Sequence, residues 1–253
     1  MEHIKTTKDG PVRTIVLARP EKRNAIDAGM LEALRALFNE APEPADRVVV
    51  LRSEGHVFCA GLDLNERLQA VGKPGDSPIL PLLHAVETYP LPVVAVVQGD
   101  AIAGGNELAL HCDFVVASTA ARFGMPLARI GRAPSWLLAK KLLESTGPVT
   151  TREMLFLAEP VPAARMYEVG AIARLVEPDA LDAAADAVVE QIVGNAPLAL
   201  RAIKALLARA MTFRDDIDHA DIDEFVKAAR NSNDSREGIK ARLEIRMPVF
   251  KGE

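Results

Sequence analysis

The segment 98–113, QGDAIAGGNELALHCD, constrains the fold of this chain more than any other part of it. It follows the segment 92–97, PVVAVV, a continuous apolar run rich in β-branched residues that is typical of a strand buried on both faces. The chain then turns at Gly99 and at Gly104-Gly105, and a helical pattern starts with ELAL at 107–110. The sequence therefore predicts a strand, a glycine turn and a helix in succession.

A helix start of this kind suits a group that becomes negatively charged. The first backbone N–H groups of a helix have no partners within it, and the helix dipole adds partial positive charge there. The pair Gly104-Gly105 lets a carbonyl of another molecule come close, and Glu107 is then a candidate base one turn along. The same residues also fit a tight turn and a dipole complement with no chemistry, and this segment alone favours that structural interpretation.

Composition and charge exclude several classes of protein. With 49% hydrophobic and 26% charged residues among 253, the chain can bury a large core, which excludes disordered and fibrous proteins. The net charge of −5 disfavours a nucleic-acid partner. The two cysteines are not in a C-x-x-C pair, and no histidine or cysteine spacing indicates a metal. The charged N-terminal segment 1–20 and the lack of a long apolar run predict a cytoplasmic protein with no membrane partner.

Hydrophobic periodicity predicts alternating strands and helices followed by a helix-rich tail, which is typical of an α/β core with an α-helical appendage. Asp27 and Asp63 are candidate helix caps, and Asp63 and Glu66 have the spacing of a capping box. Strands are expected at 4–8 and 13–18, as a hairpin around Asp9-Gly10, and at 47–52, 92–97, 114–117 and 171–176. Helices are expected at 30–38, 80–89, 134–144, 151–157, 163–169, 179–193, 198–211, 216–229 and 235–245, and a surface loop at 70–81.

Four motifs occur in an order and spacing that resemble those of the enoyl-CoA hydratase/isomerase family, the crotonase superfamily. They are ARPEKRNAI at 18–26, VFCAGLDL at 57–64, GDAIAGGNELALHCD at 99–113, and RFGMP at 122–126 with Gly131 and Pro134 beyond it. The resemblance implies an α/β fold with a crotonase-like spiral of ββα units over residues 1–195 and a C-terminal α-helical oligomerisation region over 196–253. It also implies self-association as a homotrimer or a dimer of trimers.

The resemblance further implies an acyl-CoA thioester substrate whose carbonyl oxygen is held by two backbone N–H groups. By their positions in the motifs, these belong to Leu62, after the AG of FCAG, and to Gly104, the first glycine of GGNE. Such donors stabilise the enolate-like charge that develops on the oxygen. Glu107 falls on one of the two catalytic carboxylates of the family. Coenzyme A enters as part of the substrate, and neither a metal nor another cofactor is implied.

Contacts to the substrate and its CoA are implied for residues within or beside these motifs. They are Lys22, Arg23, Ala25, Ala60, Leu62, Asp63, Leu64, Gly105 and Leu127. In the tail, where many relatives have EKR, this chain has EIR at 244–246, so Arg246 and Lys251 are the candidate phosphate contacts there.

The second catalytic carboxylate of the family has no counterpart in this sequence. Its position in FGMPLARIG holds Leu127, which transfers no proton, and the nearby Arg129 and Arg132 stay charged at neutral pH. Three activities remain, in order of preference: hydration or dehydration of an enoyl- or 3-hydroxyacyl-CoA with Glu107 as the only acid/base group, double-bond isomerisation, and hydrolysis of the retro-Claisen type. An acyl-CoA-binding relative with little activity is the non-enzyme alternative.

Overall fold

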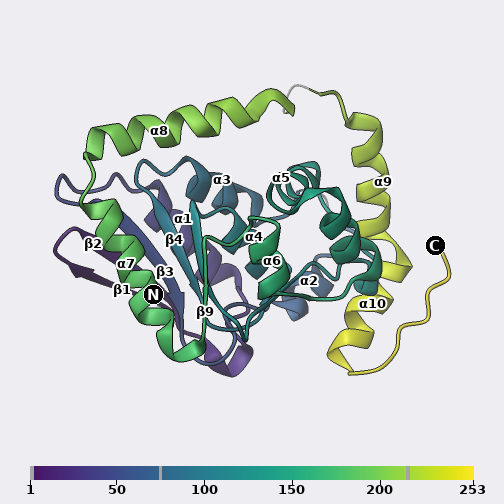
Figure 1. Cartoon of the computed structure of the whole chain (residues 1–253). Helices are drawn as coiled ribbons and strands as arrows, with labels where there is room; N and C mark the ends of the chain where they lie inside the picture. The colour runs from purple at the N-terminus through teal and green to yellow at the C-terminus, as the bar shows by residue number, and fades with distance from the viewer. Residues whose placement is uncertain (1–2, 74–75, 215–216) are drawn as a thin grey trace.

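The computed structural model describes residues 3–73, 76–214 and 217–253 (Figure 1). Within these ranges the larger sheet has six strands in the order β1-β2-β3-β4-β6-β9. β1 and β2 form the predicted antiparallel hairpin around Asp9-Gly10, and the other neighbouring strands are parallel. The strands are β1 Ile4–Asp9, β2 Val12–Leu17, β3 Val48–Ser53, β4 Val93–Val97, β6 Phe114–Ser118 and β9 Arg174–Val176.

A smaller sheet in the described part of the chain consists of three short strands, β5 Ala101–Ile102, β7 Arg122–Gly124 and β8 Val161–Pro162. β5 and β7 are parallel, and β7 and β8 are antiparallel. The chain passes from β4 through β5 into helix α4, Gly104–Leu110, and from β6 through β7 towards helix α5, Trp136–Arg152. This repetition of two strands and a helix is the unit expected for a ββα spiral.

The central strand β4 is buried on both faces, as its apolar run predicted. Val93, Ala95 and Val97 face the main core, together with buried residues of α1, Ala28–Asn39, and α3, Leu80–Thr88. Val94 and Val96 face a second cluster with α7, Leu181–Val193, which covers the other side of the sheet (Figure 1). Alternate side chains of a strand point to opposite faces, so one continuous apolar run supplies both layers.

The C-terminal helices extend along two sides of this core (Figure 1). Helix α8, Pro197–Ala210, is attached through Lys204, whose ammonium lies 2.7 Å from the Asp113 carboxylate and donates to the carbonyl oxygens of Val86 and Leu91. Helix α10, Asn233–Leu243, packs against helix α2, Leu64–Gln69. The remaining elements are η1 Pro20–Lys22, η2 Ala128–Ile130, the π-helical turn η3 Glu153–Leu157, α6 Ala163–Glu168, η4 Pro178–Ala180, η5 Met211–Arg214 and α9 Ala220–Asn231.

Both predicted helix caps are confirmed. Asp27 accepts a hydrogen bond from the Met30 N–H at 2.8 Å, and Asp63 accepts one from the Asn65 N–H at 2.9 Å. The capping box is wrong, because Glu66 accepts from the Ala28 N–H, whereas the Asp63 N–H donates to the Ile26 carbonyl. Glu66 thereby joins α2 to the start of α1 instead of closing its own helix.

Several predicted boundaries differ from the structure. The helix expected to start with the pattern at Glu107 begins at Gly104, and α5 continues past Glu144 through a break at Gly147, where φ is 70°. The strand expected at 171–176 is shorter, Arg174–Val176. Positions 74–75 of the expected loop and 216 of an expected helix lie outside the described residues. The division at 195/196 stays a prediction. Among the described residues, no helix has both the length and the apolar character needed to span a bilayer.

Candidate active site

Two backbone N–H groups meet at the start of α4. A Cβ atom on Gly61 would lie 2.9 Å from the Gly104 nitrogen, so the loop that carries Leu62 lies directly against the helix start. Neither the Leu62 N–H nor the Gly104 N–H has a hydrogen-bond acceptor among the described residues. The residues that precede them, Gly61 and Ala103, both have positive φ, of 91° and 50°. These backbone turns leave two donors free beside one another, at the two positions that the family motifs single out.

Ala103 is held in a conformation that alanine rarely adopts. Its φ of 50° and ψ of −120° cost of the order of 1–3 kcal/mol, and such strain is found mainly at functional sites. The Ala103 N–H donates to the Gly124 carbonyl at 2.8 Å, and the Ala103 carbonyl accepts from the Glu107 N–H at 3.0 Å. The strained residue is therefore fixed from both sides, and it sets the direction of the next N–H, that of Gly104.

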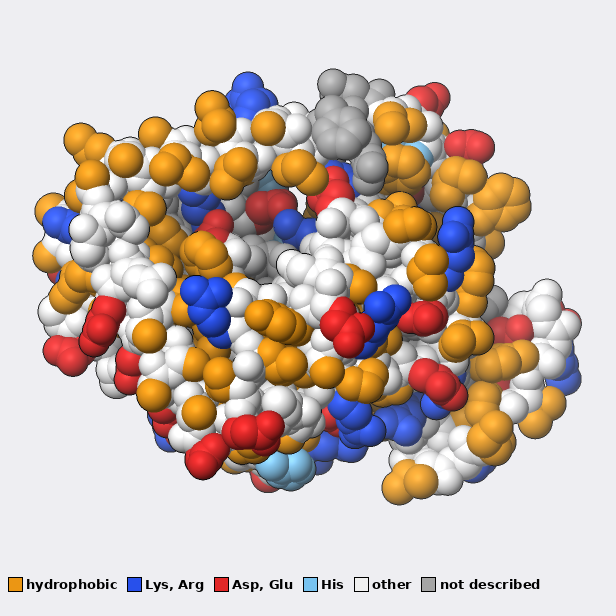
Figure 2. All heavy atoms as spheres, viewed as in Figure 1, with side chains coloured by type: hydrophobic (Ala, Val, Ile, Leu, Met, Phe, Trp, Pro, Cys, Tyr) orange, Lys and Arg blue, Asp and Glu red, His pale blue; other side chains and the backbone are white. Residues whose placement is uncertain are grey.

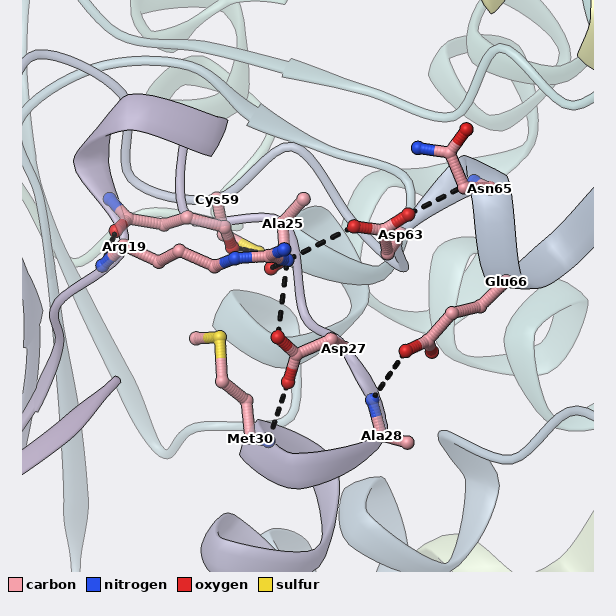
Figure 3. Close-up of polar contacts among 10 residues, drawn as sticks. Arg19, Ala25, Asp27, Ala28, Met30, Cys59, Asp63, Asn65 and Glu66 are labelled. Carbon is pink, nitrogen blue, oxygen red and sulfur yellow. Dashed lines mark hydrogen bonds and ion pairs between the residues drawn. The ribbon is translucent and has the colours of Figure 1, made fainter. Parts of the chain in front are cut away.

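The loop that carries Leu62 is fixed by backbone and ionic contacts. The Ile26 N–H donates to the Gly61 carbonyl, and the Asp63 N–H donates to the Ile26 carbonyl. Both neighbours of Leu62 are therefore hydrogen-bonded to Ile26, which fixes the backbone at Leu62. Arg19 binds the carboxylates of Asp63, at 3.0 Å, and Asp27, at 3.3 Å (Figure 3). The segment 18–26, which we call the basic loop, and the loop that carries Leu62 are thereby joined through the Arg19 guanidinium group.

The Asp63 carboxylate is fully used within the protein. Burial raises its pKa, but hydrogen bonds from the Asn65 N–H and from Arg19 outweigh burial and hold the pKa below its usual range. Asp63 lines the cavity, yet its side chain supports the Leu62 loop and has no free cation-binding or proton-transfer role.

Glu107 is the buried acid of the site. Its side chain lines the cavity, only 8% of the residue is exposed, and no cation or hydrogen-bond partner for its carboxylate is present among the described residues. Burial alone raises its pKa to about 7. A carboxyl group with this pKa exchanges protons in both directions near neutral pH.

Every other described carboxyl group that lines the cavity is exposed or paired. Asp100 binds Arg122 at 2.6 Å, and Asp223 lies 3.0 Å from His219. Leu127, at the position of the second family glutamate, is half-buried and packs against the main core. Glu107 is thus the only buried carboxyl group among the described residues of the cavity wall.

Comparison with known proteins shows the family of this chain. A family model described as enoyl-CoA hydratase/isomerase matches residues 7–253. The chain belongs to the enoyl-CoA hydratase/isomerase family. It is 34% identical over 250 residues to a Thermus thermophilus protein described as an enoyl-CoA hydratase, over 95% of this chain and 98% of that protein. It is 32% identical over 261 residues to the carnitinyl-CoA dehydratase of Salmonella typhi, over 99% of each.

Solved structures of the enoyl-CoA hydratase/isomerase family share the fold. A methylmalonyl-CoA decarboxylase in complex with 2S-carboxypropyl-CoA superposes with a TM-score of 0.91 and 25% identity, over 100% of this chain and 99% of that chain. The expected crotonase-like α/β fold and the expected hydratase-like class of enzyme are both confirmed by these relatives.

Most of the residues carried over from the family motifs line one cavity of about 1480 Å³. They are Lys22, Arg23, Ala25, Ala60, Leu62, Asp63, Leu64, Gly104, Glu107 and Leu127. Gly105 is different: a Cβ there would lie 2.2 Å from the Cys59 carbonyl oxygen, so this glycine permits close packing behind the cavity and is not part of its wall.

The tail offers no free phosphate contact at Arg246. Its guanidinium group is bound by Glu237, at 2.5 and 2.8 Å, and by Glu244 at 2.6 Å. A side chain with two carboxylate partners has little positive charge left for a ligand. Among the described residues, no group of three or more His, Cys, Asp or Glu side chains is placed to hold a metal ion.

Three cavity residues were missed by the sequence reasoning as binding residues: Arg67 on α2, Arg132 after η2, and Arg230 at the end of α9. Arg132 was considered only as a proton carrier and set aside. The sequence holds one usable signal, the position of Arg132 five residues after Leu127. Arg67 and Arg230 lie outside the family motifs and come to the cavity only through the packing of α2 and α9.

Proposed function

We propose that this protein is an enoyl-CoA hydratase-like enzyme that adds water to an enoyl-CoA or removes it from a 3-hydroxyacyl-CoA. The observation that carries the proposal is the free pair of N–H groups of Leu62 and Gly104 beside the buried Glu107 carboxyl group. A thioester carbonyl oxygen that accepts from both donors is polarised, and the enolate charge is stabilised where it forms. An acyl-CoA substrate is supported by the CoA-ester complex of the decarboxylase with the same fold.

Glu107 carries out both proton transfers in this mechanism. Its carboxylate takes a proton from water while the water oxygen bonds to the β-carbon of the enoyl group. The electron pair of the double bond moves to the thioester oxygen, which the Leu62 and Gly104 N–H groups hold as an enolate. The protonated Glu107 then returns its proton to the α-carbon. In the reverse direction Glu107 removes the α-proton and protonates the leaving hydroxyl group.

Because Leu127 provides no second carboxyl group, we rank the competing activities by how well Glu107 alone can carry them out. An isomerase shifts a proton along the chain, and a retro-Claisen hydrolase directs water at a carbonyl group, and Glu107 alone is a possible base for each. Hydration ranks first because one carboxyl group with a pKa of about 7 serves as both base and acid without a second residue. An acyl-CoA-binding protein with little activity stays the non-enzyme alternative.

The basic loop is the proposed entry for CoA. Lys22 and Arg23 are exposed at the cavity, and the Arg23 carbonyl accepts from the Ala60 N–H at 3.0 Å, two residues before the Leu62 donor. A phosphate group bound by this loop lies on the approach to the oxyanion donors. We propose no cofactor beyond the CoA of the substrate.

Self-association is proposed as a homotrimer or a dimer of trimers. Apolar side chains gather along α8 on the face shown in Figure 2, and Leu198, Ile203, Leu206 and Leu207 are each more than half exposed. Exposed apolar patches of this kind mark interaction surfaces. The cytoplasmic location stays a prediction from the sequence.

Mass analysis after incubation with enoyl-, 3-enoyl- and β-ketoacyl-CoA thioesters tests the proposed reaction. We expect a gain of one water with the thioester intact, and its loss in Glu107→Gln. Glu21→Gln is the matched control, because Glu21 is an exposed carboxyl group at the same cavity. An unchanged mass with a moved double bond supports the isomerase, a cleaved product supports the hydrolase, and no turnover with retained binding supports the non-enzyme alternative.

A further inference from the structure

Three arginine side chains converge on the cavity from separate parts of the chain. Arg67 comes from α2, Arg132 from the segment between η2 and α5, and Arg230 from the last turn of α9. All three are half-buried. Among the described residues, no carboxylate forms an ion pair with any of them, and the buried Arg67 Nε has no hydrogen-bond partner. They form what we call the arginine cluster.

The three charges of the arginine cluster repel one another, and this repulsion adds to burial in lowering the pKa values of Arg67 and Arg132. Burial, together with the nearby positive charges of Arg67 and Arg230, lowers the pKa of Arg132 to about 10. Burial and Arg230 likewise lower the pKa of Arg67. Like charges that are held together in a partly desolvated wall destabilise the free protein. A purely structural arginine is expected to have an acidic partner instead.

Other arginines of this chain do have such partners. Arg19 binds Asp63 and Asp27, and Arg122 binds Asp100. One acid acts on the cluster from a distance: the charge of Glu66 raises the pKa of Arg67, but it is the smallest of the influences on that group, and the Glu66 carboxylate itself accepts from the Ala28 N–H. Within the described residues, no ion pair neutralises the cluster, so most of its positive charge is left for a ligand.

One member of the arginine cluster, Arg132, lies on the same backbone turn as Leu127. The Arg132 N–H donates to the Leu127 carbonyl at 3.0 Å. The loop proposed for CoA is attached elsewhere, since the Arg23 carbonyl accepts from the Ala60 N–H. The two basic regions thus belong to different segments of the cavity wall, and Arg132 lies on the turn that begins at the residue that replaces the second family glutamate.

We propose that the substrate of this enzyme carries a carboxylate on its acyl group, and that Arg67, Arg132 and Arg230 bind it. The inference rests on the proposed acyl-CoA chemistry and names the class of acyl group: a dicarboxylic acid joined to CoA through one end. Guanidinium groups bind carboxylates through two parallel hydrogen bonds, which fixes the orientation of the chain as well as its charge. Leu127 fits this assignment because a glutamate there would repel the substrate carboxylate.

Binding of unreactive saturated thioesters tests the inference apart from catalysis. We compare succinyl-, glutaryl- and adipyl-CoA with butyryl-, pentanoyl- and hexanoyl-CoA and with free CoA by calorimetry. At least one dicarboxylic thioester should bind about tenfold or more tighter than its uncharged match, as expected for a charged hydrogen bond. Equal affinity within all three pairs overturns the inference. If discrimination is present but no enoyl-CoA turns over, the inference stands and the proposed reaction fails.

Arg132→Gln separates an acyl carboxylate from a CoA phosphate. We expect the preference for the dicarboxylic thioester to fall about tenfold, with unchanged affinity for free CoA and for the uncharged thioesters. Equal weakening of all ligands, including free CoA, assigns the cluster to CoA phosphate and overturns the inference. Arg129→Gln is the control, because Arg129 is exposed at the same cavity and lies 3.5 Å from Glu159.

Folding of the variants is checked by their melting temperature. Removing one charge relieves repulsion, so Arg132→Gln should melt at or above the temperature of the unmodified protein without ligand. Arg230→Gln, on a different helix, provides a second test of the same loss of preference. If Arg132→Gln and Arg230→Gln both fold and both keep the full preference for the dicarboxylic thioester, the assignment is wrong.

Discussion

Replacing Glu107 by glutamine should remove a pH dependence of stability as well as the activity. In the folded protein, burial raises the Glu107 pKa from 4.5 to about 7. At 1.36 kcal/mol per pKa unit, this difference corresponds to about 3 kcal/mol between the two protonation states. The folded state therefore binds more protons than the unfolded state between pH 4.5 and 7. This contribution to stability is fully present below pH 4.5 and is lost as the pH rises through about 7.

Activity should have the opposite pH dependence. The proposed mechanism starts with the Glu107 carboxylate as base in either direction, so kcat/KM should rise about tenfold per pH unit below 7 and level off above it. The pH range that activates the enzyme is the range in which the buried charge destabilises it. Glutamine keeps the shape of the side chain but has no proton to lose, so both effects should disappear together.

The assay is a double difference of melting temperatures. We measure the unmodified protein and Glu107→Gln at pH 5 and pH 8, and the Glu21→Gln control alongside them. The comparison cancels the constant cost of burying an amide, and it cancels other buried groups such as His111, whose pKa burial lowers to about 4. Between pH 5 and pH 8 the expected loss is about 2.5 kcal/mol, which corresponds to roughly 5–10 °C for a chain of this size. An identical pH dependence in the two proteins, or a flat kcat/KM through pH 7, refutes the reasoning.

Three further substitutions test how the site is built. Gly61→Ala should lower kcat about a hundredfold by displacing an oxyanion donor, whereas Gly72→Ala, also at positive φ but in open space, should only lower the melting temperature. Arg19→Met should cost about 1–3 kcal/mol of stability and lower kcat, because the Asp63 carboxylate loses its cation; an unchanged kcat contradicts its proposed positioning of the Leu62 loop. Lys204→Met should cost about 1–3 kcal/mol in thermal unfolding by removing the donor to the Val86 and Leu91 carbonyls, and an unchanged melting temperature contradicts the anchoring of α8.

The local features of the site were predictable because they depend on short stretches of sequence. The apolar run, the glycine turn and the following helix each have a pattern that is read within a few residues. The start of α4 at Gly104 was missed because glycine has a poor intrinsic preference for helix. Packing overrides that preference: Gly105 lies so close to the Cys59 carbonyl that only a residue without a Cβ fits.

The long-range features were not predictable from the sequence. The two oxyanion donors come from different segments, and only the family motifs paired Leu62 with Gly104 in advance. The strain at Ala103 carries no sequence signal, since an alanine there looks like an ordinary helix former. The role of Glu66 in bonding α1 rather than its own helix, and the convergence of the arginine cluster, both depend on contacts between distant elements.

The positive charge of the cavity connects two features of this protein: the leucine at position 127, where the family has a glutamate, and the arginine cluster. Among the described residues of the cavity wall, Lys and Arg side chains outnumber Asp and Glu side chains, so the net charge is positive whether Glu107 is protonated or not. A glutamate in place of Leu127 would lie on the segment that carries Arg132 and would neutralise part of the cluster. Leucine leaves that positive charge available. The absence of a second proton carrier in this sequence and the presence of the arginine cluster therefore describe one electrostatic arrangement, in which the substrate supplies the second carboxylate of the site.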